Sequence, residues 1–88
     1  MRYTVVWRDQ AQTDLTTILN PARDKQTVFR AARAADRRLT HRPLKVGESR
    51  DVRYRRVAYL GWLYLVFVVD RVDHVVFVER VRWIGPIP

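Results

Sequence analysis

Trp62–Val69, with the sequence WLYLVFVV, is the longest apolar run in this 88-residue chain. Its β-branched and aromatic residues favour a strand. Because both faces of such a strand would be apolar, we expect it to lie at the centre of a sheet and to be covered on both sides. The run is far shorter than the roughly 20 residues that a membrane-spanning helix requires, so we expect no membrane segment.

Strand patterns also lie on both sides of this run. Val75–Trp83 follows a short polar turn at residues 70–74, and Asp51–Ala58 precedes the run across a turn at residues 59–61. Residues 44–49, which contain a glycine, are expected to form a loop. Successive strands joined by short turns predict an antiparallel meander.

The N-terminal half combines one strand with two helices. Residues 2–7 are β-branched and aromatic, which favours a strand, and Asp9 is a plausible N-cap for the helix that follows. Apolar residues then recur at helical spacing in two segments, which are separated by Asn20-Pro21 and ended before Pro43. The recurring positions are Ala11, Leu15, Ile18 and Leu19 in the first segment and Val28, Ala31, Ala32, Ala35 and Leu39 in the second.

The order of elements is therefore β-α-α-β-β-β within one domain spanning residues 1–88. This order predicts an α+β fold, in which an antiparallel sheet carries an α-hairpin packed on one face. The first strand must pair with the meander across the two helices, and the other face of the sheet is expected to be partly open.

Net charge is the most unusual property of the composition. The chain carries 17 Lys and Arg against 9 Asp and Glu, a net charge of +8. Residues 23–56 hold 12 basic and 4 acidic side chains, so the whole excess lies in this middle segment. Such a segment favours an anionic partner such as nucleic acid, although a solvated surface rich in arginine is the alternative.

Several kinds of chemistry are excluded or disfavoured. The chain has no cysteine, which excludes a disulfide scaffold and a thiol nucleophile. His41 and His74 lie far apart without patterned carboxylates, and no glycine-rich phosphate loop is present. We therefore expect no metal and no cofactor. The N-terminus has no signal-peptide pattern, so a cytoplasmic location is expected.

Basic residues are most concentrated between Lys45 and Arg56. Five cations and one tyrosine in this stretch favour phosphate binding with a stacking group. In a strand, Arg53 and Arg55 would project from one face and Arg56 from the other. The alternative is an edge strand whose charges prevent aggregation.

These features together resemble the RelE/ParE superfamily of bacterial toxin–antitoxin toxins. The resemblance covers the whole chain, from the opening strand Tyr3–Trp7 through the helix end at Leu39…Pro43 to the closing strands. Its most specific part is Gly47-Glu48-Ser49-Arg50, the loop that leads into the arginine-rich strand.

The resemblance to RelE-like members implies an endoribonuclease that cleaves mRNA in the ribosomal A site without a metal. By position it assigns catalysis to Arg80, Arg82 and Arg56, and RNA binding to Lys45, Arg50, Arg53, Tyr54, Arg55 and Trp83. The chain departs from this pattern at Trp83, because an indole cannot act as an acid or a base. Whether the protein is an enzyme is therefore left open by the sequence.

Two alternatives follow from that departure. ParE-like members lack the RNase groups and some inhibit DNA gyrase, and a non-catalytic basic RNA-binding module is the third interpretation. Both toxin interpretations imply a cognate antitoxin protein and a link to plasmid stabilisation. The cellular target would be RNA and the ribosome for a RelE-like toxin, and DNA gyrase for a ParE-like toxin.

Overall fold

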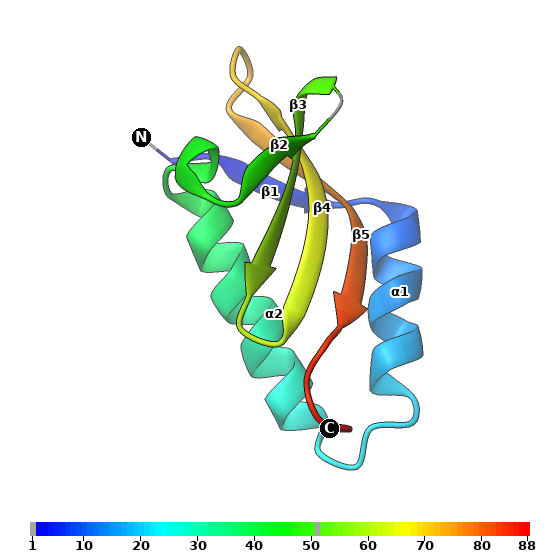
Figure 1. Cartoon of the computed structure of the whole chain (residues 1–88). Helices are drawn as coiled ribbons and strands as arrows, with labels where there is room; N and C mark the ends of the chain where they lie inside the picture. Colours follow the sequence, from blue (N-terminus) through cyan, green and yellow to red (C-terminus); the bar gives the residue numbers. More distant parts are fainter. Residues whose placement is uncertain (1, 51) are drawn as a thin grey trace.

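A computed structural model describes the backbone of residues 2–50 and 52–88 and the side chains of residues 2–49 and 55–88. The elements in chain order are β1 (Thr4–Trp7), α1 (Asp9–Leu19), α2 (Lys25–Thr40), the 3-10 helix η1 (Pro43–Lys45), β2 (Glu48–Arg50), β3 (Val52–Leu60), β4 (Leu63–Asp70) and β5 (Val75–Trp83) (Figure 1). In this part of the chain, no helix is long and apolar enough to cross a membrane.

The five strands form one sheet in the order β1-β5-β4-β3-β2. Strands β2 to β5 pair antiparallel with their neighbours in sequence. Strand β1 pairs parallel with β5, from Thr4 opposite Val75 to Trp7 opposite Val78. The α+β class and the element order are confirmed, but the sheet is mixed and not purely antiparallel. The helical crossover between β1 and the meander is what allows the parallel pairing.

Strand β2 is an addition that the sequence did not predict, because residues 44–49 were expected to form a loop. Gly47 adopts a φ of 69°, a conformation that glycine tolerates far better than other residues. The turn at Gly47 directs Glu48 and Ser49 along β3, where they pair with Val57 and Arg56. The segment that joins η1 to β3 is thereby held against the sheet.

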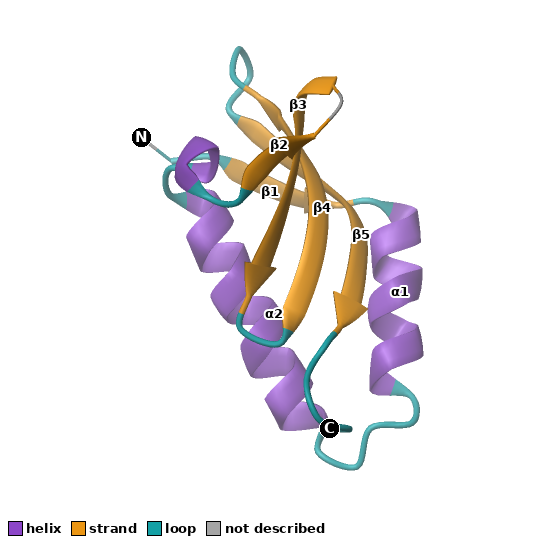
Figure 2. Cartoon of the chain, in the orientation of Figure 1, coloured by secondary structure: helices purple, strands orange, loops and turns teal. Residues whose placement is uncertain are grey.

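The two helices take different positions relative to the sheet. Helix α2 lies across one face, whereas α1 runs beside β5 (Figure 2). The N-cap of α1 is Arg8 and not Asp9, so that prediction was wrong. The backbone N–H of Arg8 still donates to Val78 O (3.0 Å), and the helix begins only after this bond. The N-cap of α2 is Asp24, whose side chain accepts from Thr27 N at 3.2 Å.

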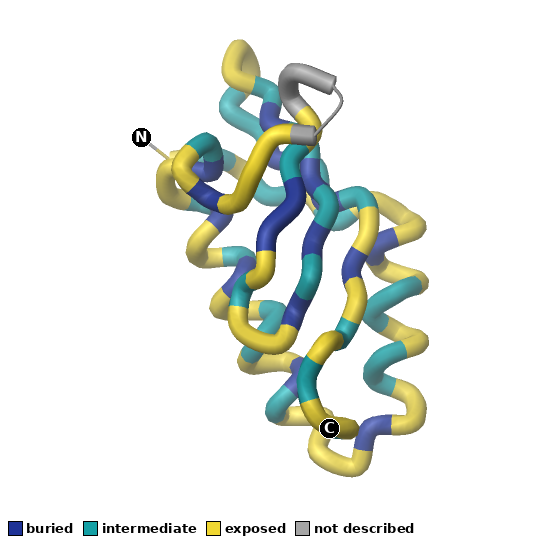
Figure 3. Tube along the Cα trace, in the orientation of Figure 1, coloured by how far each residue is buried: buried dark blue, intermediate teal, exposed yellow. Residues whose placement is uncertain are grey.

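The core lies between α2 and one face of the sheet. Alternate residues of β4 are buried, and Phe67 among them has no exposed surface. They form one cluster with Ala35 and Leu39, two buried residues of α2. The alternation of buried and half-buried residues along β4 can be followed in Figure 3. The central position of β4 is confirmed. The prediction that β4 is covered on both sides is wrong, because the intervening residues of β4 are only half-buried. Both helices lie away from that second face.

Candidate nucleic-acid interface

The face of the sheet turned away from α2 is here called the open face. In the registers of the sheet, Tyr64, Val66 and Val68 of β4 share this face with the residues opposite them, which are Tyr59, Val57 and Arg55 of β3 and Arg82, Arg80 and Phe77 of β5. Side chains alternate between the two faces of a strand, so the apolar run of β4 supplies side chains both to the core and to the open face. The open face therefore combines aliphatic and aromatic surface with arginine.

Aromatic rings lie at both ends of the open face. The ring centroids of Tyr59 and Tyr64 are 5.0 Å apart with an interplanar angle of 54°, and Tyr59 is 69% exposed. Near the other end, the guanidinium of Arg8 lies 4.4 Å from the ring centroid of Phe77, a cation–π contact. Exposed rings and a stacked guanidinium are the groups on which nucleic-acid bases stack.

Two further arginines supply charge on this face. Arg55 Nε lies 3.4 Å from Glu79 Oε1, and the two side chains are 45% and 28% exposed, so water screens this pair. Arg82 lies opposite Tyr64, is exposed, and makes no ion pair with any described side chain. Arg82 is therefore the cation on the open face that is most available to a phosphate.

Arg80, which the resemblance assigned to catalysis, is directed towards α1. The β4–β5 register shifts between Val66 and Phe67, so no residue of β4 lies directly opposite Glu79. Next to this irregularity, Arg80 Nε donates to Asp14 Oδ2 at 2.9 Å and Arg80 Nη2 to Asp14 Oδ1 at 3.3 Å. The backbone N–H of Val81 donates to the same carboxylate at 3.0 Å. Arg80 and Asp14 thus fasten α1 to β5.

The hydrogen bond from Arg80 is the main reason that the pKa of Asp14 lies below its ordinary value. Partial burial opposes this effect, whereas the N–H of Val81 and the side-chain amide of Gln10 reinforce it. The side chain of Asp14 is 13% exposed and its carboxylate is charged at neutral pH, so the ion pair between Asp14 and Arg80 is formed at neutral pH.

Arg56, the third residue assigned to catalysis, lies on the opposite side of β3 from Arg55. Its Nε donates to Val46 O at 2.9 Å, its Nη2 to Gly47 O at 2.9 Å and its Nη1 to Ser49 Oγ at 3.0 Å. All three contacts are with residues 46–49, which comprise the link after η1 and the start of β2. The guanidinium therefore holds that segment and is turned away from the open face.

The residues assigned to RNA binding are separated by the fold. Arg55 lies on the open face, whereas Lys45 lines a cleft at the end of α2. Trp83 packs against the core, and its indole N–H donates to Pro86 O at 2.7 Å. The side chains of Arg50, Arg53 and Tyr54 lie outside the described residues, as does Asp51 altogether.

Sequence reasoning missed four contributors to the open face: Arg8, Tyr59, Tyr64 and Phe77. Alternation along β4 could have placed Tyr64 on the face opposite Phe67. Strand order was needed to bring Arg8 to Phe77, because these residues are far apart in the chain. Within the described residues, no three His, Asp or Glu side chains gather closely enough to hold a metal ion.

Comparison with known proteins finds this geometry among solved structures. No protein-family model and no curated protein sequence matches the chain. Among solved structures, a chain of the RelBE2 toxin–antitoxin complex from Mycobacterium tuberculosis is 26% identical, with a TM-score of 0.76 over 94% of this chain and 99% of that one. The chromosomal ParDE toxin–antitoxin system from P. aeruginosa is 15% identical, with a TM-score of 0.67 over 96% and 98% of the two chains.

An archaeal RelE–RelB complex from Pyrococcus horikoshii has the same fold, with 18% identity and a TM-score of 0.58 over 97% of this chain and 98% of that one. The fold is thus that of toxin–antitoxin toxins with a helix pair and a five-stranded sheet. The chain has the fold of RelE/ParE toxins, and the resemblance seen in the sequence is confirmed.

Proposed function

We propose that this protein is the toxin of a type II toxin–antitoxin system and that it cleaves ribosome-bound mRNA on its open face. The toxin class is supported by toxin–antitoxin complexes of both RelE and ParE type among its structural relatives. The choice of RNA cleavage rests on one observation. Arg82 is an unpaired, exposed cation beside an aromatic and aliphatic floor, on which a base can stack while its phosphate meets the guanidinium.

In the proposed reaction, the 2′-oxygen of a ribose attacks the adjacent phosphorus. The bond from phosphorus to the 5′-oxygen breaks, leaving a 2′,3′-cyclic phosphate and a 5′-hydroxyl. Negative charge grows on the phosphate oxygens, and Arg82 stabilises it. Arg55 contributes to phosphate binding on the same face. No metal takes part in this scheme.

The proton of the attacking hydroxyl requires an acceptor that Trp83 cannot supply. Glu79 is the carboxylate beside Arg55 on the open face, and we assign it this role. The departing 5′-oxygen takes its proton from solvent. Arg80 and Arg56 act as positioning residues in this scheme, because their guanidinium groups are bonded to Asp14 and to the segment at residues 46–49.

Primer extension on mRNA bound to purified ribosomes tests this reaction directly. Arg82→Ala is expected to slow cleavage by about 100-fold, a typical effect of removing one group that stabilises transition-state charge. The matched control is Arg30→Ala, an exposed arginine of α2 on the far side of the sheet, which should cleave at the wild-type rate. Equal rates for the two variants would refute the assignment of Arg82.

Inhibition of gyrase is the second candidate function, and the position of Trp83 favours it. The packed indole and the tail that follows it present no acid or base. If the purified wild-type chain cuts no ribosome-bound mRNA and yet arrests growth, this second function replaces the first. A supercoiling assay with purified gyrase then shows inhibition.

We also propose that the cognate antitoxin binds the groove between α1 and α2. This groove has a volume of about 490 Å³, and Leu15, Leu19 and Phe29 line it, with Phe29 43% exposed. Arg33 and Arg37 also line it, so an amphipathic helix with acidic flanking residues is complementary. Phe29→Asp should abolish rescue of growth by the co-expressed neighbouring gene while leaving toxicity intact. Full rescue of that variant would place the antitoxin elsewhere.

A further inference from the structure

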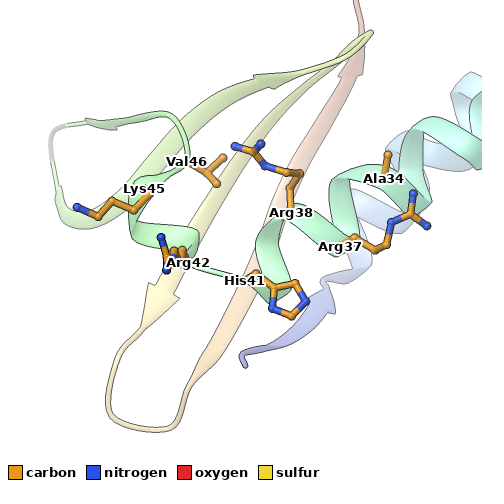
Figure 4. Close-up of a pocket in the computed structure, with 7 residues that line it drawn as sticks. All are labelled: Ala34, Arg37, Arg38, His41, Arg42, Lys45 and Val46. Carbon is orange, nitrogen blue, oxygen red and sulfur yellow. The ribbon is translucent and has the colours of Figure 1, made fainter. Parts of the chain in front are cut away.

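A second basic surface lies at the C-terminal end of α2, away from the open face. The α2–η1 cleft has a volume of about 600 Å³, and its lining residues come from the last turns of α2, from η1 and from the link between them: Ala34, Arg37, Arg38, His41, Arg42, Lys45 and Val46 (Figure 4). Arg38 extends towards Val46, and Arg42 and Lys45 lie on the η1 side. Arg37 is directed away from this group.

The backbone around the cleft is held in a defined shape. Arg42 has a φ of 54°, a left-handed conformation that is uncommon for residues other than glycine. This conformation lets the chain reverse between α2 and η1, and Lys45 N then donates to Arg42 O at 2.9 Å. The end of α2 is also bonded to the residue that precedes β1, because Tyr3 N donates to Thr40 O at 2.9 Å. The cations are therefore presented from a preorganised turn.

The charge of the cleft is not balanced within the molecule. No acidic residue lines it, and Arg38, Arg42 and Lys45 make no ion pair with any described side chain. All three are exposed. Three cations held close together in water repel one another, and an arriving anion removes this repulsion. The arrangement thus favours an anionic ligand over a purely solvated surface.

We propose that the α2–η1 cleft binds the phosphate backbone of a structured RNA. Arginine donates forked hydrogen bonds that match phosphate oxygens, and several cations in one cleft can meet successive phosphates. An acidic protein segment would also need apolar side chains to pack against, but the only apolar residues that line the cleft are Ala34 and Val46, and Val46 is itself buried. The cleft would bind phosphates whether or not the open face cleaves RNA.

The test measures binding of a fluorescein-labelled RNA hairpin to the purified chain by fluorescence anisotropy, between about 50 and 200 mM salt. The triple variant Arg38→Gln, Arg42→Gln and Lys45→Gln removes the cleft cations. The control Arg23→Gln, Arg30→Gln and Arg71→Gln removes the same charge from exposed positions outside the cleft. Circular dichroism checks that both variants are folded.

Loss of three phosphate contacts should lower the slope of log K against log salt by about 2.7, and should weaken binding by more than about 100-fold at the lowest salt. The control should lose less than about one unit of slope. Equal losses in both variants would overturn the proposal, because binding would then follow net charge alone. Tighter binding of a labelled polyglutamate peptide than of the hairpin would also overturn it, in favour of an acidic protein partner.

Discussion

Replacing Phe67 by alanine tests the two-sided reading of β4. The side chain of Phe67 has no exposed surface and faces α2, while its strand neighbours Val66 and Val68 face the open side. The change removes a fully buried ring and leaves a cavity, for which about 3–5 kcal/mol is typical. A chain of 88 residues has roughly 4–13 kcal/mol of unfolding free energy in total, so the variant should be close to unfolding at 25 °C.

The matched control is the same substitution at Phe29, whose side chain is 43% exposed on α2. Alanine is also the better helix former, so Phe29→Ala should cost less than about 1 kcal/mol. Urea unfolding followed by circular dichroism measures both values at equal protein concentration. A loss below about 1 kcal/mol for Phe67→Ala, or equal losses for the two variants, would refute the burial pattern of β4.

Three further predictions concern contacts that the fold creates. Asp14→Asn should lower stability at neutral pH. Because the pKa of Asp14 is lowered in the folded state, its carboxylate stabilises the fold above about pH 4, and this contribution is lost as the pH falls through the folded pKa. The variant should therefore lose less stability than the wild type in thermal melts from pH 7 to about pH 2. An unchanged pH profile would contradict the pairing of Asp14 with Arg80. Gly47→Ala should cost more than about 2 kcal/mol in urea unfolding, because a Cβ at this positive φ would meet the carbonyl of Val57, and a neutral result would remove the tight turn. Arg56→Ala should cost about 1–2 kcal/mol and increase amide hydrogen exchange at residues 46–49, whereas unchanged exchange would show that this segment does not depend on the guanidinium.

Much of the fold follows from local patterns that the sequence carries. The apolar run of β4 and the helical recurrence of Val28, Ala35 and Leu39 were enough to predict a central strand and a helix packed on the sheet. These predictions succeed because burial of apolar side chains at a period of two or of 3.6 is a property of neighbours in sequence. Strand β2 escaped prediction because a short polar segment becomes a strand only by pairing with β3.

The properties of the candidate site also fall into those that the sequence determines and those that only folding decides. The sequence by itself determined that the chain is strongly basic and that its cations are concentrated before and within β3. Only the tertiary structure decided which cations are free: Arg80 pairs with Asp14 from the other end of the chain, and Arg56 bonds to the segment before β2. Lys45 joins arginines of α2 that had the pattern of a solvated helix face. The physical reason is that a charge becomes available or neutralised through the neighbours that folding brings to it. For Arg80 that neighbour is 66 positions away in the chain, and for Arg56 the neighbours lie 7 to 10 positions away.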